Sequence, residues 1–450
     1  MALRSVLVAL GAVLLASSAI SGPVDRSLRP VPRPADAPMA QIITASVVLP
    51  QRSLRPRARP DQDIVTSQPD ITQASASNSG LQSWIKGFRS RAIKAGIKPT
   101  VYDAAMRGVR YDPEVIRRDR NQSEFTKTIW DYLDSAASAT RIKNGKAALR
   151  EHNRLLTRIE AKYGVEKEVV AAVWGLESAY GTFRGKMGVM QSLATLAYDA
   201  RRKDFFQNEL LAALKILQAG DVSPQNMTGS WAGAMGHTQF IPTSYLTYAV
   251  DFTGDGKRDI WSDDPTDALA STANYLARHG WVKGQPWGVE IKLPRGFDYE
   301  LAKRKIQKMP SDWARLGVVG MDGRAVRNYG KASVLLPAGA QGAAFMIFKN
   351  FAVIEKYNTA DAYVIGVGHL SDRIKGGKKI QGDWPRGDRA LTFKERIELQ
   401  KRLIAAGFDT KKLDGKIGPL TIAAVRDYQR SIGLIPDGYA SLAILQRLRR

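Results

Sequence analysis

Cysteine is absent from the 450 residues of this chain, and histidine occurs only four times. The lack of thiols excludes disulfides, thiolate metal sites, iron–sulfur clusters, cysteine nucleophiles and the lipid-modified cysteine that anchors a lipoprotein. The four histidines are scattered without HExxH spacing, which argues against a histidine-rich catalytic metal site. No aromatic residue occurs before Trp84, so the N-terminal part has little material for a core.

Acidic residues are scarce relative to basic ones, 43 against 67, which gives a formal net charge of +24. Such a surplus attracts polyanions: nucleic acid, anionic lipid surfaces or acidic cell-wall polymers. The basic residues are dispersed along the chain instead of forming one recognition motif, which disfavours nucleic acid. With 44% apolar residues, the length suffices for two or three folded domains.

The N-terminal residues have the pattern of an export signal. Arg4 precedes an apolar stretch over 6–15, and small residues follow at 16–21, which predicts a signal peptide over 1–22. The stretch falls short of the roughly 20 residues that cross a bilayer. A buried N-terminal helix is the alternative. Residues 23–79 hold nine of the 21 prolines, most of them near arginines, and predict a disordered basic linker.

Order is expected from residue 80 onward, and the fold class is mainly α with a small β part. Leu155, Ile159 and Tyr163 recur at helix spacing within a helical domain over 80–375. Strand-like runs at 289–293 and 333–336 predict a β insertion over about 286–340, after which helical periodicity returns at 344–357. A Gly/Lys-rich loop over 375–387 separates a last segment, 388–450.

One carboxylate lies on an apolar helix face. Val170, Val173 and Trp174 share that face with Glu177, and Gly181 follows the expected helix end. Burial and the negative end of the helix dipole both disfavour an anion there, so we expect a raised pKa, as a general acid requires. A structural glutamate paired with an arginine fits the same segment.

Residues 229–245 read GSWAGAMGHTQFIPTSY and follow ESAYG at 177–181. In order and separation these motifs resemble the MltB-type lytic murein transglycosylases, over roughly 81–372. The resemblance implies a lysozyme-like helical catalytic domain with an extra β domain and cleavage of the glycan of peptidoglycan. Independently, aromatic rings with a few placed polar groups suit sugar binding, and glycines 229, 233 and 236 would let the loop backbone approach a wide polymer.

By this resemblance Glu177 is the single catalytic acid and base. Ser230 and Gln239 match polar residues that hold the N-acetyl group and the sugar, and Tyr275 matches a tyrosine beside the catalytic glutamate. Taken singly, each tyrosine is better explained as ordinary half-buried core, and it is the set in family order that indicates a site. The other matched cleft positions are Tyr132, Tyr357, Asn358 and Tyr363.

The resemblance implies non-hydrolytic cleavage of the MurNAc-β-1,4-GlcNAc bond, with closure of a 1,6-anhydro ring. Most glycosidases use two carboxylates, whereas Asp199, Asp204 and Glu209 read as helix-surface charges. A single carboxylate fits the transglycosylase reaction. A hydrolytic muramidase on the same fold and a non-catalytic peptidoglycan-binding scaffold are the alternatives.

Residues 251–259, DFTGDGKRD, repeat the front half of an EF-hand calcium loop. Position 12 is Ser262 where that loop has a glutamate, so Asp263, Asp264 or Asp267 would have to substitute, and the resemblance favours Asp267. Lys257 could offer only its backbone carbonyl. No cofactor is required by the implied reaction, and the loop fits a structural Ca²⁺ or an Asp/Gly-rich turn. The candidate ligands are Asp251, Thr253, Asp255, Lys257 and Asp267.

The C-terminal segment resembles the three-helix peptidoglycan-binding module, through features such as the turns Asp414-Gly415 and Asp437-Gly438. From Leu391 on it has 12 basic and 6 acidic residues, a net +6 that suits an acidic wall polymer. Together the motifs predict an exported enzyme of the periplasm of a Gram-negative bacterium, not lipidated. Its expected partner is the glycan strand, and not nucleic acid, with weak membrane association through the linker and protein partners unknown.

Overall fold

The computed structural model describes residues 71–120 and 127–450. The predicted signal peptide and the linker as far as residue 70 lie outside them. The predicted linker end at residue 79 was wrong, because helix α1 spans Ile71–Lys94. Its downstream half buries Leu81, Ile85 and Phe88. Once these residues fix the helix, the preceding polar residues extend it without repeating the cost of nucleation.

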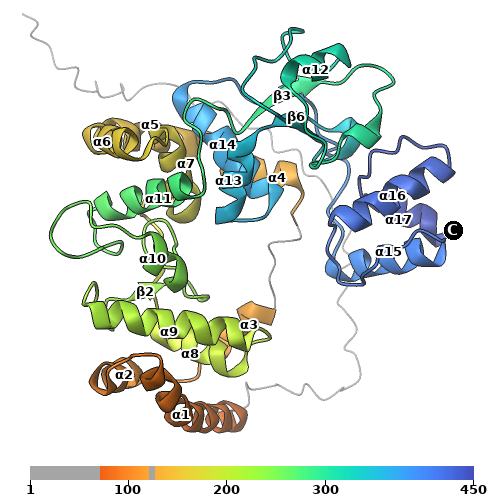
Figure 1. Ribbon diagram of the computed structural model, residues 1–450. Coiled ribbons are helices and arrows are strands. Elements are labelled where there is room, and N and C mark those ends of the chain that lie inside the picture. The colour runs from red at the N-terminus through yellow and green to blue at the C-terminus, as the bar shows by residue number, and fades with distance from the viewer. Residues whose placement is uncertain (1–70, 121–126) are drawn as a thin grey trace, which may run out of the picture. The chain divides into compact units, whose positions relative to one another are not determined.

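Helices build most of the fold (Figure 1), as the sequence predicts. Helix α7 lies at the centre and packs on α14, α5, α11 and α6. Its valines, alanines and tryptophan are buried all round, which is typical of a core helix. Helices α8 and α9 form a tight pair, joined by α1, α2, α3 and α10. The bounds are α2 Pro99–Met106, α3 Pro113–Arg120, α4 Ile129–Ala136, α5 Ala139–Glu151, α6 Asn153–Tyr163, α7 Lys167–Ser178, α8 Val189–Asp199, α9 Lys203–Ala219, α10 Pro242–Tyr248, α11 Thr266–Arg278, α13 Lys349–Tyr357 and α14 Asp361–Lys375.

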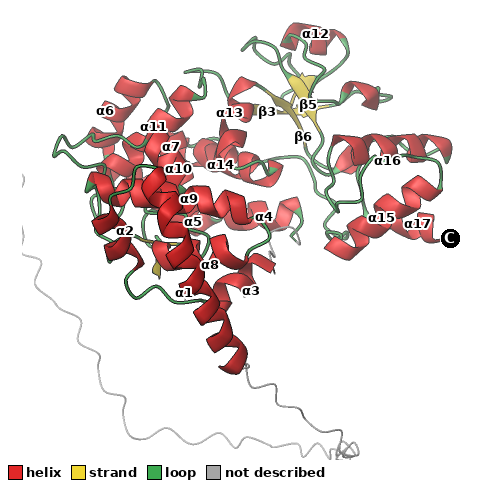
Figure 2. Ribbon diagram, turned by 60° about the horizontal axis from the view of Figure 1, so that its bottom comes forward, coloured by secondary structure: helices red, strands yellow, loops and turns green. Residues whose placement is uncertain are grey.

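The predicted β insertion is a four-stranded antiparallel sheet, drawn in yellow in Figure 2. Its order is β4-β3-β6-β5, and it packs with α12 over a core of its own around Trp313. Residues 344–347 were expected to be helical but form β6, and α13 begins only at Lys349. All four β6 residues are buried, and such a short apolar run fits strand and helix alike. The bounds are β3 Gly288–Lys292, β4 Val319–Gly320, β5 Ser333–Leu335, β6 Ala344–Ile347 and α12 Pro310–Arg315, with a separate pair β1 Met187–Gly188 and β2 Thr228–Gly229.

The C-terminal segment folds as the predicted three helices, α15 Phe393–Ala405, α16 Pro419–Ser431 and α17 Leu442–Arg449. Leu399, Leu403, Val425 and Leu445 are buried in its separate core. The chain reaches it through residues 376–392, which hold neither helix nor strand. Within the described ranges, no helix is both long and apolar enough to cross a membrane.

Candidate active site

Glu177 is the second-last residue of α7, as the sequence predicts for the helix end. The helix stops because Ala179, Tyr180 and Gly181 all have positive φ angles, 49°, 60° and 86°. The first two are not glycines, so tertiary contacts must hold this conformation. Tyr180 provides them: its hydroxyl donates to the Arg141 carbonyl over 2.9 Å.

Two helical glycines make room for the Tyr180 ring. A Cβ atom on Gly175 of α7 would lie 2.5 Å from the ring, and one on Gly145 of α5 would lie 2.4 Å from the hydroxyl. Any larger residue at either position would displace the ring. The geometry at the end of α7, and with it the direction of Glu177, therefore depends on these two glycines.

Glu177 is half-buried and faces α14. Its Oε1 accepts a hydrogen bond of 2.5 Å from the hydroxyl of Tyr363. Tyr363 is buried, and this burial raises the pKa of its phenol well above the usual value. The hydroxyl consequently stays a donor at every physiological pH and holds one carboxyl oxygen in place.

The predicted tyrosines form a continuous aromatic cluster behind Glu177. Tyr357 stacks on Tyr363 with ring centroids 6.5 Å apart, and Tyr275 meets Tyr357 at 4.9 Å. The hydroxyl of Tyr357 donates to the Thr238 carbonyl at 2.6 Å, which ties the cluster to the 229–245 loop. Tyr275 joins this cluster through Tyr357. Its hydroxyl donates to the backbone of Lys356.

Tyr132 and Asn358 lie at the edges of the cluster. Tyr132 is half-buried on α4, and its ring would be 3.0 Å from a Cβ atom on Gly366 of α14. Asn358 is exposed, and its Oδ1 accepts the Ala360 N–H just before α14. In this structure, Asn358 thus stabilises the turn that leads into the helix carrying Tyr363.

Ser230 and Gln239 shape the loop in which they stand. Ser230 Oγ accepts the N–H groups of Ala232 and Ala234, and Gln239 Nε2 donates to the carbonyls of Arg184 and Gly236. Both amide hydrogens of Gln239 are then engaged. By valence, the groups left for a ligand are the Ser230 hydroxyl proton and Gln239 Oε1.

The glycines of this loop approach their own chain, contrary to the expectation that they make room for a polymer. A Cβ on Gly229 would lie 2.2 Å from the Ala234 carbonyl oxygen, and one on Gly236 would lie 2.2 Å from that of Ile260. At Gly233 the obstacle would be the Leu193 side chain. Small residues are required here because the loop folds back tightly.

His237 is a site residue that sequence reasoning missed, although it lies inside the motif. It is buried, and its Nδ1 accepts the Trp174 indole N–H at 3.1 Å. Nε2 then carries the proton and donates to the Ser262 carbonyl at 2.8 Å. Its backbone carbonyl accepts the Ser178 hydroxyl at 2.5 Å. Burial lowers the pKa of the ring, so neutral His237 joins the end of α7 to the loop before α11.

Glu209 was expected on a helix surface but is buried. Its two carboxylate oxygens accept the backbone N–H and the hydroxyl of Thr243, at 3.0 and 2.7 Å. Thr243 stands in the first turn of α10, where an anion is favoured by the helix dipole. Burial raises the pKa of Glu209. This carboxylate anchors the 229–245 loop and is not available as a second catalytic group.

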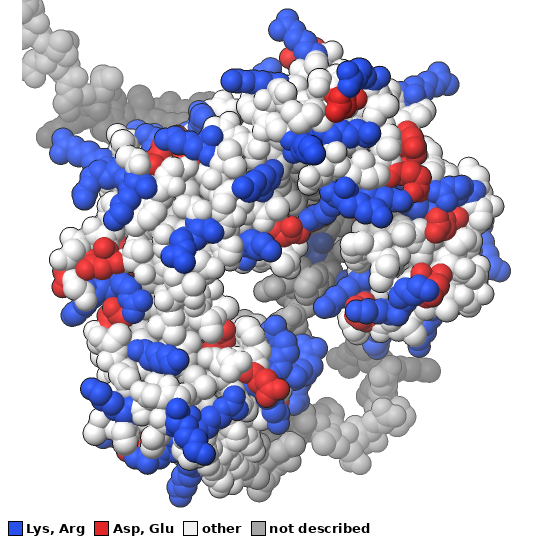
Figure 3. Space-filling model, viewed as in Figure 1, with Lys and Arg blue, Asp and Glu red and all other residues white. Residues whose placement is uncertain are grey.

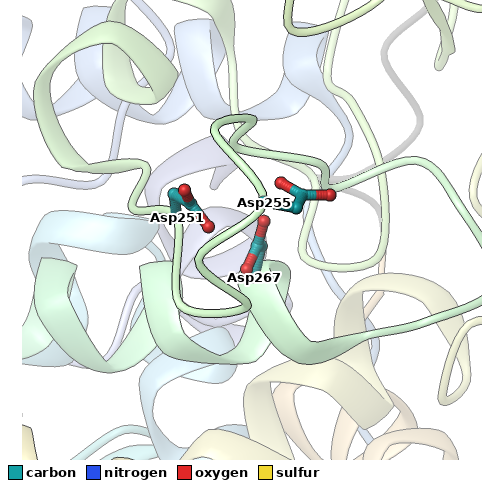
Figure 4. Close-up of side chains that lie close together, drawn as sticks. All are labelled: Asp251, Asp255 and Asp267. Carbon is teal, nitrogen blue, oxygen red and sulfur yellow. The ribbon is translucent and has the colours of Figure 1, made fainter.

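The acidic loop gathers three of its predicted ligands. Carboxylate oxygens of Asp251, Asp255 and Asp267 lie within 4.8 Å of one another (Figure 4). Thr253 donates its hydroxyl to Asp251, and Lys257 donates its backbone N–H to Asp255. Three carboxylates on one loop and the start of α11 suit a hard cation such as Ca²⁺.

The sequence matches the family model described as "Transglycosylase SLT domain" over residues 80–372 and that described as "Putative peptidoglycan binding domain" over 394–448. Membrane-bound lytic murein transglycosylase B of Escherichia coli (strain K12) is 35% identical over 240 residues, which are 52% of this chain and 63% of that relative's length.

Similar solved structures agree with these matches. SltB3 of Pseudomonas aeruginosa, crystallised in complex with NAG-anhNAM-pentapeptide, is 49% identical with a TM-score of 0.80, over 82% of this chain and 99% of that one. The lytic transglycosylase Slt35 of Escherichia coli, solved in complex with calcium, is 30% identical with a TM-score of 0.56, over 66% and 93%. The predicted resemblance is confirmed: this chain belongs to the SLT-domain transglycosylase family and carries a C-terminal peptidoglycan-binding domain.

Proposed function

We propose that this protein is a lytic transglycosylase that cleaves the MurNAc-β-1,4-GlcNAc bond of peptidoglycan with Glu177 as its single acid and base. The observation that carries the proposal is the half-buried Glu177 at a helix C-terminus, with Oε1 held by Tyr363. Both the burial and the negative end of the helix dipole favour the neutral acid, which is the form that can donate a proton.

The reaction needs two proton transfers at one carboxyl group. Glu177 donates its proton to the glycosidic oxygen while the bond from that oxygen to C1 of the muramic acid breaks. The substrate's N-acetyl oxygen stabilises the positive charge that develops at C1. The ionised Glu177 then takes the proton of the C6 hydroxyl, whose oxygen bonds to C1. No water is consumed, and the product ends in 1,6-anhydro-MurNAc.

The other predicted residues have supporting roles in this scheme. The Ser230 hydroxyl and Gln239 Oε1 are placed on the tight loop where they could hydrogen-bond a sugar or its N-acetyl group. The Tyr275, Tyr357 and Tyr363 rings pack on one another beside the carboxyl group, and the Tyr363 hydroxyl holds it. The complex of SltB3 with NAG-anhNAM-pentapeptide supports the proposed product, since that ligand bears the anhydro end.

Digestion of purified sacculi tests this function, with released fragments analysed by mass spectrometry. We expect fragments one water lighter than reducing-end products, and a loss of release of at least about 1,000-fold in Glu177→Gln. Glu168→Gln, a change of the same kind in the first turn of α7, is the matched control. Reducing-end fragments would identify a hydrolytic muramidase, and binding without release would identify a scaffold.

We further propose that the protein acts in the periplasm and is retained at the wall by its C-terminal module. Basic side chains are spread over the face seen in Figure 3, where acidic ones are fewer. This agrees with the net charge of +24 and with an acidic polymer as partner.

We also propose a structural Ca²⁺ held by Asp251, Asp255 and Asp267. Asp267 lies in the first turn of α11 and already accepts the N–H groups of Phe252 and Thr253. A cation there would neutralise the three carboxylates and fasten the loop to the helix. The reaction itself needs no metal.

A further inference from the structure

The C-terminal module contains two Asp-Gly turns that are built alike. In each, one glutamine is clamped to the turn. Gln400 Oε1 accepts the Gly415 N–H at 2.9 Å while its Nε2 donates to Asp414 Oδ1 at 3.2 Å. In the second turn, Gln429 Oε1 accepts the Gly438 N–H at 2.8 Å and its Nε2 donates to Asp437 Oδ1 at 2.7 Å.

The likeness extends beyond the glutamines. Oδ1 of Asp414 and of Asp437 also accepts the N–H two residues further on, at 2.9 Å in both turns. An apolar residue seven positions before each glutamine covers the turn glycine. A Cβ on Gly415 would lie 2.6 Å from Phe393, and one on Gly438 would lie 2.7 Å from Ile422. Asp414 and Asp437 therefore occupy equivalent positions, and their Oδ1 atoms accept the same two kinds of hydrogen bond.

The second turn already holds a backbone segment of the same chain. Asp437 Oδ2 accepts the backbone N–H of Ala340 at 2.8 Å. A Cβ on Gly339 would come within 2.4 Å of that same oxygen, so the chain at 339–340 passes directly over the turn. Arg430 pairs with Glu300 beside it. A turn of this construction thus offers one carboxylate oxygen to a peptide N–H.

The first turn presents the same oxygen to solvent. Among the described residues, Asp414 Oδ2 accepts no hydrogen bond, and Asp414 is exposed. The surrounding side chains are unusually apolar for a surface: Phe393 is 59% exposed, Leu413 49% and Leu420 50%. Lys416 occupies the position equivalent to Tyr439 and is exposed as well.

We propose that the Asp414-Gly415 turn is a binding site for the stem peptide of peptidoglycan. An amide N–H of the stem donates to Asp414 Oδ2, the stem packs on Phe393, and Lys416 meets a stem carboxylate. The stem is favoured over the glycan because the equivalent turn binds a peptide backbone. The net charge of +6 on the module complements the acidic stem. The proposal rests on the proposed function insofar as it takes peptidoglycan as the ligand.

Calorimetry on the full chain tests this site, in a Glu177→Gln background that leaves ligands uncleaved. The probes are the free pentapeptide stem and a NAG tetrasaccharide. Asp414→Asn can keep its one amide oxygen at the Oδ1 position for the clamp, which places the NH2 group, a donor, at the Oδ2 position. We expect it to weaken stem binding at least about 10-fold, the usual loss for a hydrogen bond to a charged group. Asp427→Asn, an exposed aspartate of α16, should leave binding unchanged.

Phe393→Ala should weaken stem binding by a similar factor, and the control Ile432→Ala, 41% exposed, should not. Unchanged stem affinity in both Asp414→Asn and Phe393→Ala would overturn the proposal. So would a loss confined to the NAG tetrasaccharide, which would assign the site to the glycan. Release of fragments from sacculi is measured separately, with Glu177 intact. If that chain releases no anhydro product while Asp414→Asn still weakens stem binding, the proposed reaction is refuted and the proposed stem site is not.

Discussion

The hydrogen bond between Glu177 and Tyr363 joins side chains that are 186 positions apart. Helix spacing predicted that Glu177 shares a face with buried residues, and the structure agrees. Spacing alone could not show that Tyr363 faces it, because two helices pack in a way that local patterns do not encode. Only the family resemblance marked Tyr363. His237 was missed because a lone histidine in a glycine-rich motif gives no sign of burial.

Tyr363→Phe removes the donor to Glu177 Oε1 and leaves the ring in place. The ionised carboxyl loses a stabilising bond, so the alkaline limb of the pH–rate profile, along which the protonated acid is lost, should move to higher pH. We expect the rate on sacculi at neutral pH to fall at least about 10-fold, since a hydrogen bond to a charged group contributes about 1.5–3 kcal/mol. Initial rates across pH give both values. Tyr163→Phe, on α6, is the control, and an equal loss there would contradict a specific role for Tyr363.

At the scale of elements, the sequence predicted a mainly helical domain, the β insertion and the C-terminal three-helix module. The predictions that were wrong lie where one sequence pattern is compatible with two kinds of structure. The apolar run at 344–347 gave no means to choose a strand, and the pairing of Phe345 with Glu290 in β3 decided it. The linker boundary failed because polar residues before Leu81 extend a helix that tertiary contacts nucleate.

The loop before α11 offers a test by metal addition and removal. If Asp251, Asp255 and Asp267 hold Ca²⁺, the ion stabilises the folded chain by about 2.7 kcal/mol at a free concentration 100 times its dissociation constant. Thermal unfolding in EDTA should therefore occur at a lower temperature than in Ca²⁺. Asp251→Asn should reduce this difference, whereas Asp204→Asn, exposed on α9, should retain it. An EDTA-insensitive melting temperature in the parent chain would contradict the proposed site.

At the scale of the whole molecule, two groups of α14 make opposing contributions to stability against acid. Burial lowers the pKa of His369 from 6.5 to about 4. Burial raises the pKa of Asp372, three residues further along α14, from 3.8 to about 6, although the Trp287 indole N–H donates to it at 2.9 Å. As pH falls from 6.5 to 4, the unfolded state takes up a proton at the histidine, which destabilises the fold. The folded state takes up a proton at the aspartate, which stabilises it.

Each shift corresponds to about 3 kcal/mol, so the two contributions nearly cancel in the parent chain. Asp372→Asn removes the stabilising proton uptake, and its free energy of unfolding should fall about 3 kcal/mol further than the parent's between pH 6.5 and 4. His369→Gln should shift the dependence the other way by a similar amount. Denaturant unfolding at pH 7, 5.5 and 4 measures both, with exposed Asp383→Asn as the control. Parallel curves for all four chains would mean that neither group changes its proton occupancy on folding. Because both groups lie on the helix that carries Tyr363, opposite slopes would show that the acid tolerance of the catalytic domain is balanced within α14.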